Sequence, residues 1–363
     1  MFLGAFCANA APLRIATWHV ELERKGPGLL LRDILKGEDP AIAAVARTIA
    51  RVSPDVLLLT GFDWDLGLAA LSAFADRLRA EGAPYPYLFA LRPNNGMATG
   101  VDLDGDGRLG GPRDAQGYGR FAGNGGMALL SRLPIDRPAV RDFTDLLWRD
   151  FPDAMLPMVN GKPFPSAEAQ AIQRLSSAGH WDVPLITETG ARLRLLAFAA
   201  GTPVFDGPED RNGRRNHDEV SLWSRYLDGQ LGPGAPSGPV ILLGNANLDP
   251  EDGEGRRAAI RRLLADPRLQ DPRPSSAGAV QAARDQGGAN RAQTGDPALD
   301  TADWRDAGGP GNLRVSYVLP DAGLRVTGAG VFWPDRADPL RPLIEAEGAP
   351  RHRLVWVDVE LPP

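Results

Sequence analysis

Cysteine is almost absent from this chain of 363 residues, and its single copy, Cys7, stands near the N-terminus. One cysteine cannot form an internal disulfide, so a small fold held together by disulfides is excluded. The sequence also lacks any run of about 18 apolar residues, which excludes a hydrophobic membrane-spanning helix. We therefore expect a globular protein whose hydrophobic residues, 43% of the chain, form an interior core.

An excess of positive charge is also missing. The formal net charge is −6 at pH 7, and the sequence pI is about 5.4. This balance argues against bulk electrostatic attraction to nucleic acid or to anionic membranes, although a local basic patch remains compatible with it. Glycine and proline are abundant, with 42 and 33 copies, which predicts long loops between short elements.

The first ten residues are apolar and small, and Ala8-Asn9-Ala10 fits a small-x-small cleavage site. We interpret residues 1–10 as the remnant of a signal peptide and residues 11–363 as a single domain, which predicts a secreted or periplasmic protein. Cys7 would leave with the leader. The alternative is a disordered tail, since a charged segment before the apolar run is missing.

The hydrophobic pattern predicts more strands than helices. Residues 240–243 form an apolar run bounded by turn residues, which is typical of a strand buried on both faces. Residues 40–52 are an Ala-rich helix with Pro40 in its first turn and Asp39 as N-cap. The other predicted strands are 13–20, 55–59, 85–91, 127–131, 183–186, 193–198, 313–319, 323–332 and 353–361. The other predicted helices are 66–80, 216–227 and 255–264. With a hairpin at 183–198, this order favours a mixed-sheet α/β sandwich over a doubly wound parallel sheet.

Two amides follow the buried strand at 240–243. Asn245 and Asn247 are two positions apart, so in extended geometry they point to one side. Polar groups at the end of a buried strand are where α/β proteins usually place a site. The alternative is a strand that simply runs into an Asn-Asp-Pro turn.

Asp102, Asp104 and Asp106 alternate before Gly107, as in the first half of an EF-hand-type Ca²⁺ loop. Position twelve of such a loop would be Arg113 instead of the expected acid, and the flanking segments are not helical. Three acids packed this closely repel one another unless a cation is present, so we predict a structural Ca²⁺ here. The alternative is a series of Asp/Gly turns.

Two further polar segments stand out. Arg211, Arg214 and Arg215 lie close together just before a predicted helix, which suits a phosphate or carboxylate ligand. The alternative is a solvated loop whose charges pair internally. Residues 287–304 form a long irregular polar loop that either overhangs a site or lies on the surface.

Several separated blocks resemble the endonuclease/exonuclease/phosphatase superfamily, which has the deoxyribonuclease-I-like fold. The blocks are Arg14-Ile-Ala-Thr-Trp18, Pro54-Asp-Val-Leu-Leu-Leu59, Gly126-Met-Ala-Leu-Leu-Ser-Arg-Leu-Pro-Ile135, Ile241-Leu-Leu-Gly-Asn-Ala-Asn247 and His352-Arg-Leu-Val-Trp-Val357. Their order and spacing match along nearly the whole mature chain, and the chain resembles a secreted bacterial branch of the superfamily. The resemblance implies a four-layer α-β-β-α sandwich of two mixed, largely antiparallel sheets. It also implies phosphoester hydrolysis at a Mg²⁺-type site at one edge of the sheets.

The chain departs from the family pattern at most positions of that chemistry. Where the pattern has Asn, Glu, His, Asp, Asp and Asp, this chain has His19, Gly61, Ala199, Asn245, Ser316 and Arg351. Asn247 and His352 keep the family identity. Gly61 cannot ligate an ion, Asn245 carries no charge for Mg²⁺, and Arg351 replaces an anion with a cation. These changes predict that the Mg²⁺ site is lost.

The sequence therefore predicts a catalytically degenerate member, a pseudoenzyme that keeps the fold for binding. Asn245, Asn247 and His352 would form the remnant site, where a phosphate or other anionic ligand could bind with the help of Arg351. The alternative is an active secreted phosphodiesterase, phosphatase or nuclease with relocated metal ligands. Asp63 and Asp65 are the first candidates for such ligands, unless they form a polar strand-to-helix turn. A weaker idea is an anion-binding protein that uses the arginine cluster. The sequence does not indicate an oligomeric state.

Overall fold

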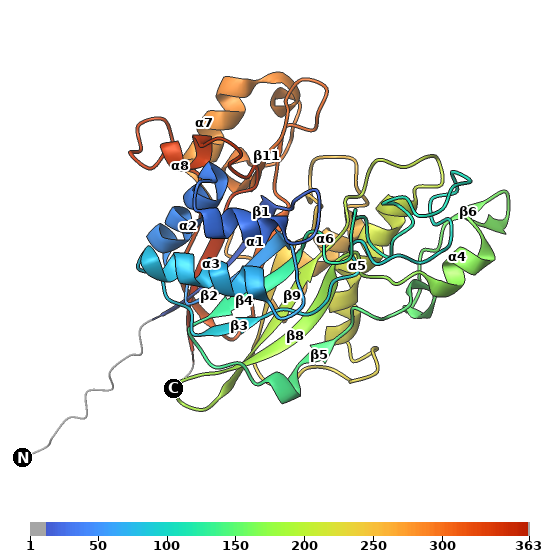
Figure 1. Ribbon diagram of the computed structural model, residues 1–363, viewed down its shortest axis with the longest axis horizontal. Coiled ribbons are helices and arrows are strands. Elements are labelled where there is room, and N and C mark those ends of the chain that lie inside the picture. Colours follow the sequence, from blue (N-terminus) through green and yellow to red (C-terminus); the bar gives the residue numbers. More distant parts are fainter. Residues whose placement is uncertain (1–11, 362–363) are drawn as a thin grey trace, which may run out of the picture.

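Two β-sheets pack face to face, and helices cover both outer faces in the computed structural model (Figure 1). The structure describes residues 12–361, so the predicted leader at 1–10 lies outside the described residues. Helices α1 to α3 lie together on one side of the paired sheets, and α5 and α6 lie on the other. This is the predicted α-β-β-α sandwich.

Both sheets are mixed and largely antiparallel. In spatial order the first consists of β14 (Arg325–Val331), β15 (Val355–Glu360), β1 (Leu13–Leu22), β2 (Val56–Phe62), β4 (Gly126–Ser131) and β3 (Tyr87–Phe89). The second consists of β13 (Ser316–Pro320), β10 (Val240–Asn245), β9 (Arg192–Ala199), β8 (Gly179–Ile186) and β5 (Arg141–Asp142). Only the pairs β1–β2 and β9–β10 are parallel. Two short ribbons lie outside the sheets: β6 (Met158–Val159) with β7 (Lys162–Pro163), and β11 (Ala302–Asp303) with β12 (Asn312–Leu313).

The helices differ widely in length. The α-helices are α1 (Leu29–Lys36), α2 (Pro40–Val52), α3 (Ala69–Ala80), α4 (Ala167–Ile172), α5 (Arg211–Leu227), α6 (Ala258–Leu264), α7 (Ala277–Gln286) and α8 (Pro342–Glu345). Single 3₁₀ turns are η1 (Arg137–Ala139), η2 (Trp148–Asp150), η3 (Gly288–Arg291) and η4 (Pro297–Leu299). Among residues 12–361, no helix combines the length and the apolar character needed to cross a membrane.

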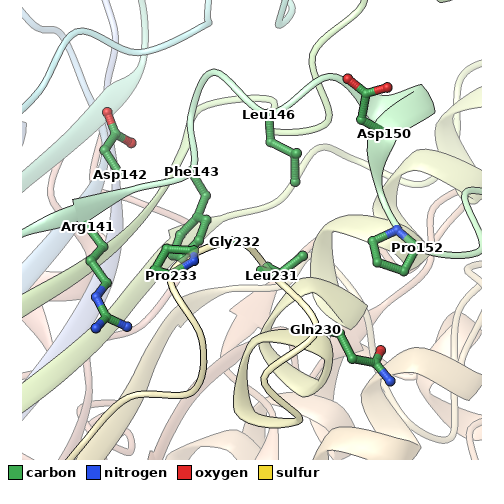
Figure 2. Close-up of a pocket in the computed structure, with 10 residues that line it drawn as sticks. All are labelled: Arg141, Asp142, Phe143, Leu146, Asp150, Pro152, Gln230, Leu231, Gly232 and Pro233. Atoms are coloured by element: carbon green, nitrogen blue, oxygen red, sulfur yellow. The ribbon is translucent and has the colours of Figure 1, made fainter.

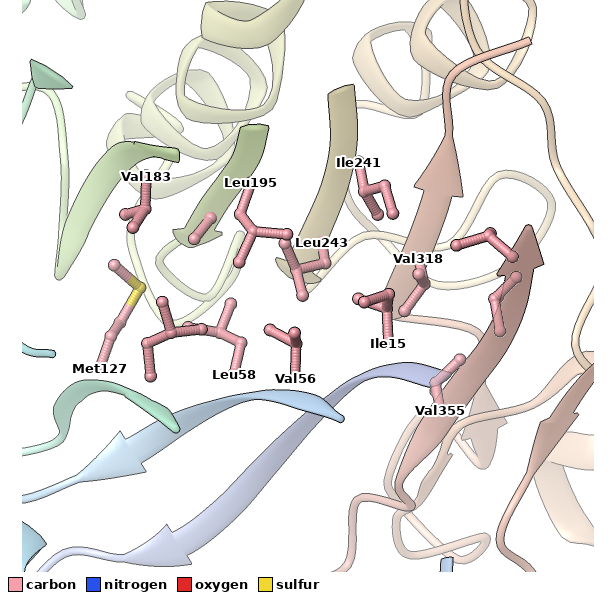
Figure 3. Close-up of a cluster of buried hydrophobic side chains, with 14 of the residues drawn as sticks. Ile15, Val56, Leu58, Met127, Val183, Leu195, Ile241, Leu243, Val318 and Val355 are labelled. Carbon is pink, nitrogen blue, oxygen red and sulfur yellow. The ribbon is translucent and has the colours of Figure 1, made fainter. Parts of the chain in front are cut away.

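The central core lies between the two sheets (Figure 3). Side chains of Val56, Leu58 and Met127 point from the first sheet toward Leu195 and Leu243 of the second. All five are 0–1% exposed. Burying one such side chain fully is worth roughly 1.5–3 kcal/mol, so this layer accounts for much of the hydrophobic stabilisation. Each sheet buries its other face under helices, which explains why β2 and β10 are buried along their whole length and are apolar except near their ends.

Local signals located several elements correctly. Helix α2 has the predicted bounds, and the Asp39 carboxylate caps it by accepting from the Ile42 backbone N–H at 3.0 Å. The predicted hairpin is the antiparallel pair β8–β9. Helix α3 begins at Ala69, three residues later than predicted at 66, because the Asp65 carboxylate caps it by accepting from the N–H groups of Ala69 and Ala70. Helices α1 and α7 were not predicted, and α5 begins five residues earlier than predicted.

Candidate functional site

The predicted site positions meet where the ends of several strands come together. In the first sheet His19 of β1 pairs with Thr60 of β2. In the second, Asn245 ends β10 between Ala199 of β9 and Ser316 of β13. Strand β1 packs against both β10 and β13. The Thr301 hydroxyl accepts the Ser316 N–H, and the next residue, Ala302, forms a β-bridge with His352, which connects the two sets of strand ends. The topology therefore gathers these positions, which lie far apart in sequence, at one edge of the sandwich.

Two imidazoles form the centre of this edge. The rings of His19 and His352 are 4.5 Å apart, centroid to centroid. The Nδ1 atom of His19 is 3.0 Å from the Thr60 hydroxyl. The His352 ring is also packed at 5.2 Å and nearly perpendicular to Trp304, which comes from the long polar loop at 287–304. That loop therefore reaches the candidate site.

His352 is almost completely buried, with 3% of its surface exposed, and its Nδ1 atom has no hydrogen-bond partner. Burial lowers the pKa of His352 well below its usual range, and the nearby His19, Arg351 and Arg353 lower it further. The imidazole is therefore neutral at pH 7. It can donate one hydrogen bond and accept another, but it cannot present a positive charge to a phosphate.

The amides of Asn245 and Asn247 do lie together, although not in the way that the strand pattern suggested. Strand β10 ends at Asn245, and Asn247 has a left-handed backbone with φ 49°. The Asn247 N–H donates to Asn245 Oδ1 at 3.1 Å, and Asn245 Nδ2 donates to Asn247 Oδ1 at 3.2 Å. Asn247 Nδ2 also donates to the Ala200 carbonyl at 2.8 Å. Asn245 and Asn247 therefore lie in a turn and form hydrogen bonds with each other.

Gly61 lies at an irregularity in the pairing of β2 with β4, and its φ is +67°. A Cβ atom there would lie 2.7 Å from His19 Cε1 and 2.9 Å from Glu23 Oε1. The side chains of His19 and Glu23 therefore occupy the space where a side chain at position 61 would begin. A glycine is required as long as those two side chains keep their places.

Glu23 is a site residue that the sequence reasoning missed. Its Oε1 atom is 3.9 Å from His19 Nε2, and 35% of its side chain is exposed. Burial raises the pKa of Glu23, while His19 opposes the rise. Counting alternate positions from His19 would not have located it reliably, because Glu21 has a left-handed backbone with φ 48° and the strand ends at Leu22.

The two aspartates considered as displaced ligands have structural roles instead. Asp63 is buried and accepts from the N–H groups of Arg24 and Gly125 and from the Asn124 amide, at 2.8–3.0 Å. Both oxygens of Asp65 cap α3. These contacts support the interpretation of this segment as a polar strand-to-helix turn.

The predicted anion-binding arginines are not gathered on one open surface. Arg215 is 6% exposed, and its guanidinium donates to the carbonyls of Leu175, Gln116, Arg174 and Ser176. Burial lowers the pKa of Arg215 to about 10, which leaves it charged at pH 7. Arg211 donates to the Leu103 carbonyl and Arg214 to the Glu209 carbonyl. Arg351 is exposed but pairs with Glu21 at 3.1 Å. Arg215 is thus a structural cation that satisfies loop carbonyls.

Asp102, Asp104 and Asp106 come together as expected for a cation site. Within residues 12–361 they are the one group of three or more acidic, His or Cys side chains whose potential ligand atoms lie within 4.8 Å of one another. Asp102 accepts from the N–H groups of Gly105 and Gly107 at 2.6 and 2.9 Å. Burial raises the pKa of Asp104, and Asp106, Asp114 and Asp102 raise it further. Asp114 itself closes the loop by accepting from Leu103 and Gly111.

A separate hollow of about 490 Å³ lies at the other end of the second sheet, beside its edge strand β5 (Figure 2). Phe143 and Leu146 line it from the segment after β5, and Leu231 and Pro233 line it from the loop after α5. It shares no residue with the strand-end site, and nothing in the structure indicates what would fill it.

The comparisons with known proteins agree with this architecture. Residues 33–345 match the endonuclease/exonuclease/phosphatase family. The chain belongs to that family. No curated protein matches the sequence.

Among solved structures, the fold resembles an endonuclease/exonuclease/phosphatase from Beutenbergia cavernae, with a TM-score of 0.55 and 16% identity over 97% of this chain and 72% of that one. A family protein from Leptotrichia buccalis has a TM-score of 0.49 and 16% identity, over 96% of this chain and 100% of that one. A sphingomyelinase C from Streptomyces griseocarneus has a TM-score of 0.44 and 17% identity, over 96% and 99%. At these identities the likeness concerns the fold alone.

Proposed function

We propose that this family member keeps the sandwich as a binding module and has lost Mg²⁺-dependent phosphoester hydrolysis. The observation that carries the proposal is the composition of the strand ends, where Gly61, Ala199, Asn245 and Ser316 contribute no charged side chain. A hard divalent ion needs carboxylate oxygens, and transition-state stabilisation by the ion normally supplies many kcal/mol. Neutral His352 offers no replacement charge.

The ligand that best suits this edge is a phosphate or another small anion held by hydrogen bonds. Asn245, Asn247 and His352 provide neutral donors, and Arg351 stands next to His352 with 60% of its side chain exposed. The acidic net charge of the chain argues for a small ligand and against nucleic acid as the partner. The arginine cluster is a weaker candidate, because Arg215 is buried and bonded to carbonyls.

Hydrolysis assays test the proposal. We expect no turnover of generic phosphomonoesters, phosphodiesters or plasmid DNA with Mg²⁺, Mn²⁺ or Ca²⁺ above the level of the His352→Ala variant. Inorganic phosphate should raise the melting temperature of the wild type and should do so less for His352→Ala. Robust metal-dependent turnover that His352→Ala abolishes would refute the loss of activity.

A second candidate function is an active hydrolase with relocated ligands, and Glu23 is the observation that favours it. Its carboxylate lies where a side chain at position 61 would begin, next to His19. If turnover is found, Glu23→Gln should abolish it. The exposed Glu38→Gln is the matched control and should leave it unchanged. Activity that survives Glu23→Gln would remove this candidate.

Export and a structural Ca²⁺ are further parts of the proposal. The Ala8–Ala10 motif supports export, and mass spectrometry of the native protein should find an N-terminus at or near Ala11. An intact Met1 on protein recovered from the cytosol would contradict export.

The proximity of Asp102, Asp104 and Asp106 supports a cation in their loop, with Ca²⁺ as the ion that the oxygen ligands suit.

A further inference from the structure

Asp300 is a buried carboxyl that no part of the proposed function uses. It follows the 3₁₀ turn η4, and only 6% of its surface is exposed. Its Oδ2 atom is buried and has no hydrogen-bond partner. Burying an ionised carboxylate without a partner costs free energy, so a buried carboxyl is usually either paired with a cation or protonated.

The surroundings of Asp300 are acidic. Asp249 and Asp252 on the loop after β10, and Asp296 at the start of η4, all disfavour its ionised form. Asp249 accepts backbone N–H groups of Glu251, Asp252 and Arg314, and Asp252 accepts those of Thr294 and Gly295. The nearby guanidinium groups pair elsewhere, Arg314 with Asp271 and Arg273 with Asp296.

A proton suits this place better than a metal ion. Among residues 12–361, the acids whose ligand atoms lie within 4.8 Å of one another in a group of three are those of the Asp102 loop. Asp300 belongs to no such group. Burial raises the pKa of Asp300 to about 8, and the charges of Asp249, Asp252 and Asp296 add to the rise. At neutral pH its carboxyl is therefore mostly protonated.

The next residue, Thr301, joins the two sheets. Its hydroxyl accepts the N–H groups of Val315 and Ser316, at 2.9 and 3.1 Å, where β13 begins in the second sheet. Its carbonyl accepts the N–H of Arg353 at 2.8 Å, just before β15 of the first sheet. Ala302 then forms a β-bridge with His352. The segment at 296–303 therefore ties the second sheet to His352.

We propose that the protonation state of Asp300 controls whether the segment at 296–303 stays packed between the two sheets. The protonated carboxyl allows the closed arrangement, in which Thr301 bonds to both sheets. Ionisation of the carboxyl weakens these contacts beside His352. When the segment opens, the carboxyl reaches water and regains an ordinary pKa. Opening therefore releases one proton and becomes easier as the pH rises, until the closed state also ionises. The inference does not depend on whether the site hydrolyses or only binds its ligand.

Hydrogen exchange of the amides that donate to Thr301 measures this opening. After correction for the intrinsic exchange rate, the opening constant at Val315, Ser316 and Arg353 should rise about tenfold per pH unit between about pH 5 and 7.5 and level off near pH 8. Asp300→Asn should make the opening constant independent of pH. Asp296→Asn, which removes the exposed acid immediately before η4, should keep the rise.

Two hydrogen-exchange results would overturn this proposal. One is an identical pH dependence in the wild type and in Asp300→Asn. The other is a rise that millimolar Ca²⁺ suppresses in the wild type but not in Asp300→Asn, which would make the carboxyl a cation ligand. A carbon-detected NMR titration of Asp300 in the wild type needs no variant that might fail to fold. It should show a midpoint near 8, and a midpoint near the ordinary value of about 4 would refute the proposal.

Discussion

At the scale of the residue, the chemistry of the site depends on what fills the space left by small side chains. Gly61 leaves room that His19 and Glu23 occupy, so a carboxylate is still present at this edge although no strand-end position supplies it. His352 is buried beside Arg351 and Arg353, and its imidazole stays neutral at pH 7. The identity of a residue therefore does not fix its chemical role, because the role also depends on burial and on the neighbouring charges.

The buried His180 gives a residue-scale prediction about acid stability. It is 0% exposed, with Nδ1 2.6 Å from the Ser176 hydroxyl and Nε2 2.9 Å from the Glu219 carbonyl. Burial lowers the pKa of His180 to about 3. The unfolded chain binds this proton near pH 6.5 and the folded protein only near pH 3, so its contribution to stability is complete above about pH 6.5 and is lost as the pH falls.

Urea denaturation from pH 7 to pH 4 checks this prediction. The wild type should lose up to about 1.4 kcal/mol per pH unit through this group. His180→Gln should be less stable at pH 7 but should have a shallower dependence on pH. His217→Gln, at a histidine with 23% of its side chain exposed, should keep the wild-type slope. Equal slopes in all three proteins would assign the acid sensitivity to other groups.

At the scale of the element, the spacing of apolar residues predicts a helix only where the buried face of that helix is apolar. Helix α5 begins at Arg211, whereas the apolar pattern predicts a start at Asn216. The first turns of this helix bury polar side chains against loops and strand ends. Arg215 donates to loop carbonyls, and Asn216 donates to the carbonyls of Gly201 and Ala246. A buried polar face gives no hydrophobic repeat, so the start of α5 could not be read from the sequence.

Helix α2 provides an element-scale prediction. The Asp39 carboxylate caps the helix through the Ile42 N–H and also pairs with Arg24 at 2.7 Å. Asp39→Ala should lower the free energy of unfolding by about 1 kcal/mol, within a range of about 0.5–2 kcal/mol. Asp39→Asn keeps the cap without the charge and should lose less, so the difference between the variants in chemical denaturation isolates the cap. Equal losses would show that the ion pair dominates.

The loop at 102–114 provides the second element-scale prediction. If it binds Ca²⁺ only in the folded state, a Ca²⁺ concentration one hundred times the Kd adds about 2.7 kcal/mol of stability, and a chelator removes it. The melting temperature should therefore fall in excess chelator, and Asp104→Asn should show no such fall. Asp76→Asn, at an exposed acid on α3, should respond like the wild type. An unchanged melting curve, with no Ca²⁺ in the purified protein, would remove the site.

At the scale of the whole molecule, stability comes from the layer between the sheets, and the site lies at the edge of that layer. The strands that carry the site residues are held by side chains such as Leu58 and Leu243, both 0% exposed. Among the strand-end residues Ala199 belongs to this packed layer, whereas Asn245 and Ser316 do not, so substitutions at those two positions can change the chemistry while leaving the fold intact. The proposed loss of the metal ligands is therefore compatible with an intact fold.

Leu243→Ala tests the contribution of this layer. Removing this buried side chain should lower the free energy of unfolding by about 2–5 kcal/mol, because a cavity opens between the sheets. Leu35→Ala, at a leucine that is 70% exposed, should change it by less than about 0.5 kcal/mol. Denaturant titration with one cooperative transition checks both values. A small loss at Leu243 would mean that the layer repacks and that the sheets are held mainly by other contacts.

The sequence by itself determined much of the scaffold. Apolar runs such as Val240–Leu243, the capped helix α2 and the order of the family blocks are local signals, because burial and capping depend on residues close together in the chain. That Gly61 and Asn245 carry no charge is also visible without coordinates. The clustering of Asp102, Asp104 and Asp106 was predicted because their spacing alone brings them together.

Only the tertiary structure decided which polar groups face one another. Glu23 reaches the space above Gly61, Trp304 packs on His352, and Arg215 bonds to carbonyls of distant loops. Asp300 meets Asp249 and Asp252 only because the chain before it folds back against the loop after β10, where Asp252 accepts the N–H groups of Thr294 and Gly295. Each of these roles depends on partners tens of residues away, and the charge state and accessibility of a buried polar group follow largely from those partners.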